Sequence, residues 1–201
     1  LQVVDISSPA FPKIVGSAGT PDNMPYRVFA GGGYAYVANN DHGLIIYDVN
    51  SPAEPAQIGA LKTSSAAQDV QVADNLAYVA TSKGLCIVDV STPSSPALAG
   101  ELETSGPASD IQVSGTYAYL LYDKGLAVID VSTPSQPKLK GSFEASAGPK
   151  RQVFLHGRHA YLADDQGLLQ IIDLSDPAQP TLFKELTSSN AWTGVHVGLG
   201  N

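Results

Sequence analysis

Residues 89–96 read Asp-Val-Ser-Thr-Pro-Ser-Ser-Pro, and the same stretch returns as Asp-Val-Ser-Thr-Pro-Ser-Gln-Pro at residues 130–137. Weaker copies begin at Asp5, Asp48 and Asp173, so the leading aspartates are spaced by 43, 41, 41 and 43 residues. A second marker, Ala-Tyr, keeps the same spacing at Tyr36, Tyr78, Tyr119 and Tyr161. A fixed period of this length indicates one supersecondary unit copied along a single array that spans residues 1–201.

Residues 70–102 show what one unit contains. Short apolar segments at 70–72, 76–80, 85–90 and 97–102 are separated by segments rich in Gly, Pro, Asn and Ser, which are typical of turns. Gly84 closes the turn before the third segment, as Gly43 and Gly125 do in other copies, and we expect a positive φ there. Four short antiparallel strands per unit predict the blade of a β-propeller.

The third strand of each unit supports stacked blades. Its copies at residues 44–47, 85–88, 126–129 and 169–172 are mostly apolar without alternation, which predicts that both faces are buried. An open single-layer sheet would alternate, and helical repeats are excluded because Gly or Pro interrupts the apolar runs every few residues. The sequence therefore predicts an all-β propeller of four-stranded antiparallel blades, about 42 residues each.

The composition excludes several classes of partner. The net charge of −8 and the absence of a basic stripe argue against nucleic acid. No apolar run approaches the roughly 18 residues of a membrane helix, so we expect no membrane insertion of this segment, and the first residues do not form a signal peptide. The lone Cys86 gives no disulfide framework, and its apolar neighbours predict a small buried side chain.

The segments Leu-Cys-Ile-Val-Asp-Val-Ser-Thr-Pro (85–93) and Leu-Ala-Val-Ile-Asp-Val-Ser-Thr-Pro (126–134) resemble the LVIVD repeat of bacterial and archaeal proteins, and the upstream Ala-Tyr-Val-Ala (77–80) fits it as well. The resemblance covers essentially the whole chain. It implies a β-propeller that is exported or displayed at the cell surface, often within a longer polypeptide. It carries no common catalytic residue, so no activity can be transferred from it.

A count of strands predicts four complete blades, starting near residues 28, 70, 111 and 153. Partial-blade strands remain at residues 1–6, 13–17 and 195–197, and the Ala-Tyr-Val-Ala strand that would join them is missing. An unpaired strand edge is a liability. We therefore expect an open or incomplete arc of blades, completed by further repeats of the same polypeptide.

The repeated aspartates, at 5, 48, 89, 130 and 173, precede Pro-containing turns, where a carboxylate accepts turn N–H groups. We prefer this role to metal binding. The Asp-x-Gly turns at residues 41–43, 123–125 and 165–167 lack the alternating ligands of a calcium loop. His156 and His159 flank a predicted hairpin turn, and nothing nearby completes a zinc site. We expect no metal and no cofactor.

One set of polar residues remains a candidate binding site. The two residues before each inner strand are predicted to gather at one mouth of the propeller channel; they are Tyr26, Arg27, Gln68, Asp69, Ser109, Asp110, Arg151 and Gln152. The adjacent turns add Asn39, Asn40, Asp41, Lys83, Tyr122, Asp123, Asp164 and Asp165. Convergent polar groups on a rigid frame are typical of a ligand site. The alternative is a self-neutralising, hydrated channel lining.

Two classes of function follow. The first is a non-catalytic binding or scaffold protein, outside the cell or at its surface, with a protein or a surface glycan as partner. The second is an enzyme or small-ligand receptor that uses the channel rim. No nucleophile elbow, zinc-protease motif, phosphate loop or dinucleotide fingerprint is present, so no catalytic residue is assigned and the first class is favoured.

Overall fold

The computed structural model describes residues 1–21, 25–145, 150–190 and 194–196, except for the side chains of Lys150 and Arg151. Within these ranges the chain forms one two-stranded sheet and four four-stranded sheets. The two-stranded sheet pairs β1 (Gln2–Asp5) with β2 (Lys13–Ser17) in antiparallel fashion. None of the described residues forms a helix long and apolar enough to cross a membrane.

The four larger sheets are consecutive, and we number them as blades 1 to 4. Blade 1 holds β3 (Arg27–Gly31), β4 (Tyr34–Ala38), β5 (Leu44–Asp48) and β6 (Ala56–Leu61). Blade 2 holds β7 (Ala67–Ala73), β8 (Leu76–Thr81), β9 (Gly84–Asp89) and β10 (Ala97–Glu103). Blade 3 holds β11 (Ala108–Ser114), β12 (Tyr117–Tyr122), β13 (Gly125–Asp130) and β14 (Lys138–Glu144). Blade 4 holds β15 (Lys150–His156), β16 (His159–Asp164), β17 (Leu168–Asp173) and β18 (Thr181–Thr187).

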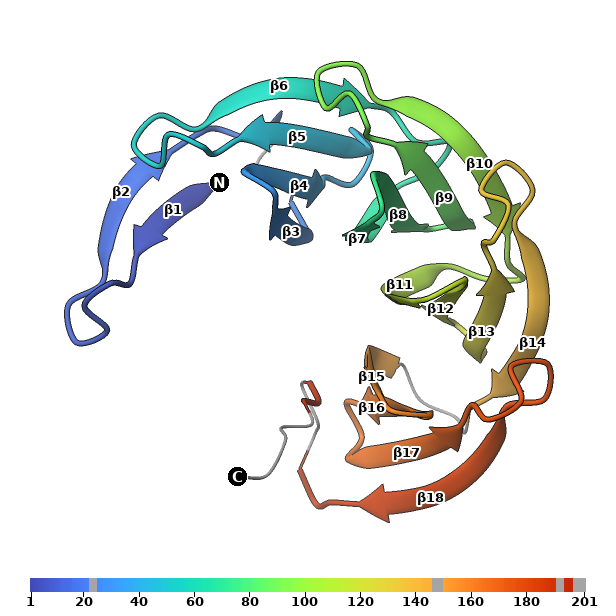
Figure 1. Ribbon diagram of the computed structural model, residues 1–201. Coiled ribbons are helices and arrows are strands. Elements are labelled where there is room, and N and C mark those ends of the chain that lie inside the picture. The colour runs from blue at the N-terminus through green and yellow to red at the C-terminus, as the bar shows by residue number, and fades with distance from the viewer. Residues whose placement is uncertain (22–24, 146–149, 191–193, 197–201) are drawn as a thin grey trace.

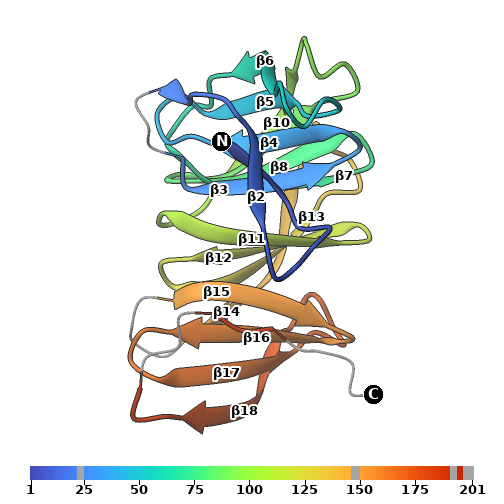
Figure 2. The ribbon, with the colours of Figure 1, turned by 90° about the vertical axis from the view of Figure 1, so that its left-hand side faces the viewer.

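Each blade is an up-and-down meander in which every strand pairs antiparallel with the next one along the chain. The blades stand side by side in an arc, with their first strands along the inside and their fourth strands along the outside (Figure 1). The β1–β2 sheet lies at one end of the arc and blade 4 at the other, and the blades are stacked along its length (Figure 2). Among the described strands no ladder joins the two ends. The predicted all-β fold of repeated four-stranded blades is confirmed.

The hydrophobic core lies between the blades rather than inside any one of them. One buried cluster joins blades 1 and 2, a second joins blades 2 and 3, and a third joins blades 3 and 4. In β9, Leu85 and Ile87 belong to one interface while Cys86 and Val88 belong to the other. Alternate residues of a strand point to opposite faces, so a third strand buried on both faces must be apolar throughout.

Cys86 is 1% exposed and packs between blades 1 and 2. Burial, together with the nearby Glu101 carboxylate, raises the pKa of its thiol to about 12. The neutral thiol acts as a small apolar side chain, as predicted from its neighbours.

All five repeated aspartates accept a hydrogen bond from the backbone N–H two residues later, at 2.8–2.9 Å, on Ser7, Asn50, Ser91, Ser132 and Ser175. Hydrogen bonds from these partners lower the pKa of each carboxyl. The predicted structural role in the Pro-containing turn is confirmed.

The turn before each third strand depends on a glycine with positive φ. Gly84 has φ +136° and Gly125 has φ +138°, and a Cβ at either position would overlap backbone atoms of the neighbouring fourth strand. Both the backbone conformation and the close approach therefore exclude a side chain.

We expect Gly84→Val and Gly125→Val each to destabilise the fold by roughly 1 kcal/mol or more, because valine must adopt a left-handed φ beside a close backbone. Thermal melting by circular dichroism measures the effect. Gly19, whose Cβ would meet nothing within 4 Å, provides the control as Gly19→Ala. Unchanged melting of both valine variants would show that the turn does not require glycine.

Candidate functional site

A β-bulge opens the first strand of blades 2, 3 and 4. The register with the second strand shifts between Ala67 and Asp69, between Ala108 and Asp110, and between Lys150 and Gln152. The extra residues at the bulges are Gln68, Ser109 and Arg151. Gln68 is half-buried and Ser109 is exposed, whereas the side chain of Arg151 lies outside the described structure. A bulge redirects the side chains that follow it.

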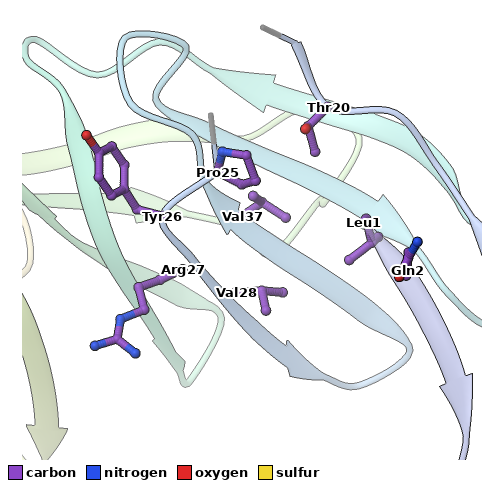
Figure 3. Close-up of a pocket in the computed structure, with 8 residues that line it drawn as sticks. All are labelled: Leu1, Gln2, Thr20, Pro25, Tyr26, Arg27, Val28 and Val37. Atoms are coloured by element: carbon purple, nitrogen blue, oxygen red, sulfur yellow. The ribbon is translucent and has the colours of Figure 1, made fainter. Parts of the chain in front are cut away.

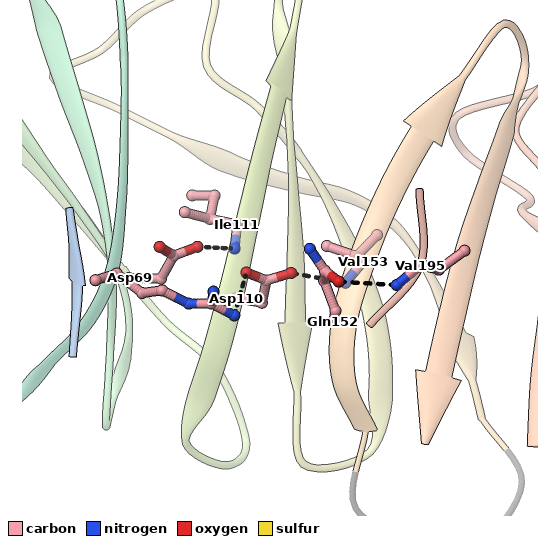
Figure 4. A network of polar contacts seen from close by, with 7 residues as sticks. Asp69, Asp110, Ile111, Gln152, Val153 and Val195 are labelled. Carbon is pink, nitrogen blue, oxygen red and sulfur yellow. Dashed lines mark hydrogen bonds and ion pairs between the residues drawn. The ribbon is translucent and has the colours of Figure 1, made fainter. Parts of the chain in front are cut away.

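The redirected side chains connect blade 2 to blade 3, blade 3 to blade 4, and blade 4 to the segment 194–196 (Figure 4). Asp69 Oδ2 accepts a hydrogen bond from the backbone N–H of Ile111 at 3.0 Å. Asp110 Oδ2 accepts from the N–H of Val153 at 2.6 Å. Gln152 Oε1 accepts from the N–H of Val195 at 2.9 Å. We call these three interactions the blade clasps.

The clasps satisfy N–H groups that the sheets leave unpaired. The first strand of a blade is an edge strand, and the N–H groups on its outer side have no ladder partner. An unpaired buried N–H costs about 1–3 kcal/mol. Gln71, two residues beyond Asp69, accepts from Val113 N–H at 2.5 Å, as the two-residue period of a strand requires.

Blade 1 carries a cation where the other blades carry an acceptor. The Arg27 guanidinium Nη2 lies 3.9 Å from Asp110 Oδ1, although the two residues belong to blades 1 and 3. The Arg27 side chain is 48% exposed and that of Asp110 is 5% exposed. Asp110 is also hydrogen-bonded to the Asp69 side chain. One carboxyl group in blade 3 therefore interacts with groups from blades 1, 2 and 4.

Asp110 holds a proton more tightly than an ordinary aspartate. Burial raises its pKa to about 8, and the hydrogen bond and negative charge of Asp69 act in the same direction. The N–H of Val153 and the charge of Arg27 oppose the shift without cancelling it. Two carboxyls in contact cannot both ionise cheaply, so the pair retains one proton near neutral pH.

Tyr26 does not join this group. It is 52% exposed and lines a separate pocket of about 460 Å³ with Leu1, Val28 and Val37 (Figure 3). Val28 is 56% exposed, whereas its counterparts Val70, Ile111 and Val153 are 0–4% exposed because the preceding blade covers them. The β1–β2 sheet contains only two strands and does not cover Val28. This pocket therefore arises because the two-stranded sheet leaves Val28 uncovered, and not because polar groups converge on it.

The polar residues of the adjacent turns mostly bond to nearby backbone. The Asn39 amide donates to Pro21 O at 3.1 Å, and Asn40 exchanges two backbone hydrogen bonds with Ala67. Asp164 Oδ1 accepts from the N–H groups of Gln166 and Leu168. The remaining predicted members of this group are Asp41, Lys83, Tyr122, Asp123 and Asp165, and none of them approaches the clasps closely enough to line the same pocket.

A pocket of about 230 Å³ lies against the clasps. Its polar lining comes from Arg27, Asp69, Gln71, Asp110, Gln112 and Gln152. Four of these side chains already accept a backbone N–H group, namely those of Asp69, Gln71, Asp110 and Gln152. Among the charged residues of the pocket, Arg27 has the most exposed side chain. The described residues hold no group of three His, Cys, Asp or Glu side chains arranged to bind a metal ion.

The histidine hairpin has the predicted form. His156 and His159 face one another across the turn between β15 and β16, where Gly157 has φ +58°. The ring of His159 packs against Phe183, with ring centroids 5.0 Å apart. The ring of His196 packs edge-on against Phe154, with ring centroids 4.8 Å apart.

A family model, described as the LVIVD repeat, matches five consecutive segments of the chain, at residues 1–20, 26–63, 65–104, 105–145 and 147–187. No curated protein matches the sequence.

Several solved structures share the fold. The computationally designed Ika8 protein is 10% identical, with a TM-score of 0.67 over 83% of this chain and 50% of its own. The designed Ika4 protein is 10% identical, with a TM-score of 0.68 over 81% of this chain and 99% of its own. A functionally unknown protein from Desulfotomaculum acetoxidans DSM 771 is 12% identical, with a TM-score of 0.73 over 89% of this chain and 61% of its own. The chain thus spans half of Ika8 and about three fifths of the bacterial protein; at these identities the likeness concerns the fold alone.

Proposed function

This chain belongs to the LVIVD repeat family, and on that premise we propose that it is a non-catalytic binding or scaffold propeller outside the cell or at its surface. The family resemblance is the support for this location. The partner we propose is a protein or a surface glycan. The net charge of −8 disfavours nucleic acid.

The observation that supports a non-catalytic function is the use of the rim acceptors by the fold. Asp69 and Asp110 each accept a backbone N–H of the next blade, and Gln152 accepts the N–H of Val195, which follows blade 4 in the chain. A general base must be free to take a proton from the substrate. A clasp oxygen is not free in this sense, because moving it away from its N–H would leave a buried donor without a hydrogen-bond partner. The chain instead offers a rigid frame with exposed turns, which is the usual basis of binding on repeat proteins.

A second candidate, a small-ligand receptor or enzyme at the rim, is favoured by one observation. Arg27 is half-exposed in the pocket beside a carboxyl whose pKa is raised to about 8. A perturbed titratable group beside a cation in a pocket is a common feature of active sites, although structural networks produce it too.

The two candidates differ in turnover at the rim. We expect the native chain to hydrolyse ester, glycoside and phosphate-ester substrates no faster than the Arg27→Gln variant does. Glutamine is chosen because blade 4 carries Gln152 at the equivalent position. Arg158→Gln is the matched control, because Arg158 is 65% exposed and lies 4.0 Å from Asp173, away from the rim. Turnover that falls by about 10² or more in Arg27→Gln, but not in Arg158→Gln, would establish the rim as an active site instead.

A further inference from the structure

A second groove, of about 450 Å³, lies between blades 1 and 2 at the opposite rim from the clasps. Blade 1 contributes Phe29, Tyr34 and Tyr36, and blade 2 contributes the turn that follows β7. We call this the aromatic groove. Its volume lies in the range of small-ligand sites, which is about 300–1,000 Å³.

The blade 1 wall of the groove is a set of three packed rings. The Tyr36 ring centroid lies 6.5 Å from that of Phe29 and 6.4 Å from that of Tyr34, with tilted or edge-on geometry. Tyr36 is 5% exposed and supports the other two, which are half-buried. Phe29 and Tyr34 therefore present part of their rings to the groove, and their packing against the buried Tyr36 ring holds them in position.

The blade 2 wall carries two exposed polar side chains at the hairpin turn between β7 and β8. Asp74 and Asn75 have φ +49° and +62°, the left-handed conformation of a two-residue hairpin turn, which Asp and Asn adopt more readily than other side chains. The equivalent turns of blades 1, 3 and 4 place glycines at their left-handed positions, namely Gly32, Gly33, Gly115 and Gly157. Among the described turns between first and second strands, the turn of blade 2 is thus the one that carries side chains at its left-handed positions.

The polar groups around the groove define the chemistry of a ligand. Asp74 supplies an acceptor, while the Asn75 amide and the Ser91 hydroxyl both donate and accept. No Lys or Arg is among the described residues that line it, and the Asp74 carboxylate repels anions. Hydroxyl groups beside apolar C–H faces match a mixed lining of this kind, because the C–H faces can lie on the aromatic rings.

We propose that the aromatic groove binds a neutral hexose glycan, with a sugar ring against Tyr34 and Phe29 and its hydroxyls on Asp74 and Asn75. This inference rests on the proposed binding function and identifies the class of ligand and its position. The groove binds the glycan without altering it, since the described lining offers no pair of carboxyls flanking a bond.

Calorimetric titration with cellotriose, maltotriose, laminaritriose and mannotriose tests the proposal, with a hyaluronan tetrasaccharide and choline as an acidic and a cationic probe. We expect at least one neutral trisaccharide to bind saturably, and neither the acidic probe nor choline to bind.

Two variants tie that binding to the groove. Tyr34→Leu copies Leu76, which occupies the equivalent position in blade 2, so the fold already accommodates this residue. Asp74→Gly combined with Asn75→Gly removes both polar side chains and replaces them with residues that readily adopt the positive φ of this turn. Each variant should weaken binding by about tenfold or more, as is usual when a central contact is removed. Tyr117→Leu makes the same change at the equivalent position of blade 3 and should leave binding unchanged.

Several outcomes would overturn the proposal: no neutral trisaccharide binds, the two variants bind as well as the native chain, or choline binds and is lost in Tyr34→Leu. The last result would show an ammonium site. The proposed function is tested separately by turnover at the Arg27 rim. If the chain neither binds a glycan nor turns over a substrate, only the glycan proposal is rejected. If the native chain turns over a substrate and Arg27→Gln does not, the proposal of a non-catalytic function is rejected.

Discussion

Replacing Gly100 with alanine will destabilise the fold by about 2–3 kcal/mol. The added methyl group would overlap backbone atoms of blade 3, so blades 2 and 3 would have to move apart to accommodate it. Gly100 lies at the bulge of β10, and its Cβ would overlap the backbone oxygen of Pro134 in the next blade's turn. Gly59 meets Pro93 in the same way between blades 1 and 2. For a chain of this size the loss corresponds to a fall in melting temperature of roughly 5–10 °C.

Position 184 supplies the control for this prediction. Lys184 in β18 stands at the bulge where β2, β6, β10 and β14 have glycine, and it is exposed. No described turn docks against it, so the requirement for glycine comes from the neighbouring turn and not from the strand's own backbone. Lys184→Ala should therefore leave the melting temperature within about 1 °C, in line with ordinary surface substitutions. Equal melting of Gly100→Ala and the native chain would contradict the docking of the Pro134 turn.

Replacing Asp110 with asparagine will remove most of the dependence of stability on pH between about 5 and 8. The native carboxyl has a pKa of about 8, raised from 3.8, so between these values the folded chain binds a proton that the unfolded chain has lost. The free energy of unfolding of the native chain must then fall as pH rises through this window and level off above about pH 8. Asparagine cannot titrate, but its amide can donate to Asp69 while its oxygen accepts from Val153.

Denaturant unfolding at several pH values measures this difference. Asp110→Asn should come closest to the native chain at the acid end of this window and exceed it most near pH 9. Asp110→Leu should be less stable than Asp110→Asn at every pH, because the N–H of Val153 is then left unpaired. Below about pH 4 all three proteins should lose stability together, since the turn aspartates with lowered pKa begin to be protonated. A native chain whose stability rises between pH 5 and 8 would show that Asp110 is not the protonated partner.

The architecture was predictable because it depends on a pattern that recurs. Local structure is specified by the period of about 42 residues, the apolar third strands and the Gly-closed turns. Because the same unit is repeated, stacking one unit on the next buries both faces of each third strand. The turn role of Asp89 and its copies was predictable for the same reason, since donor and acceptor lie two residues apart.

The roles of the rim residues could not be predicted from local pattern alone. Asp69, Asp110 and Gln152 were expected to converge, and Asp69 and Asp110 do so with Arg27. Their main partners are N–H groups 42 or 43 residues away, in the next blade for Asp69 and Asp110 and in the segment after blade 4 for Gln152. One signal was available: this separation equals the repeat period, and an acceptor precedes the first-strand apolar residue in blades 2, 3 and 4. The bulges that turn these side chains toward their partners leave no comparable trace in the sequence.

The aromatic groove was not anticipated because its two walls come from different blades. Tyr34 and Asp74 belong to different repeats, and only stacking brings them to one groove. The Asp74–Asn75 turn was predicted from its residue types, but the absence of glycine at its left-handed positions becomes informative only beside the other three turns.

Backbone amide hydrogen exchange tests the central claim, that the rim acceptors hold neighbouring blades together, most directly. We predict slow exchange at Ile111 and Val153, whose N–H groups are bonded to side chains of the preceding blade rather than to a ladder. In Asp69→Ala the amide of Ile111 should exchange at least about 10-fold faster while Val153 stays protected, because only the Ile111 clasp is removed. Asp69→Asn, which keeps the acceptor oxygen, should preserve the protection of Ile111. Fast exchange at Ile111 in the native chain, or equal protection in native and Asp69→Ala proteins, would contradict the clasp.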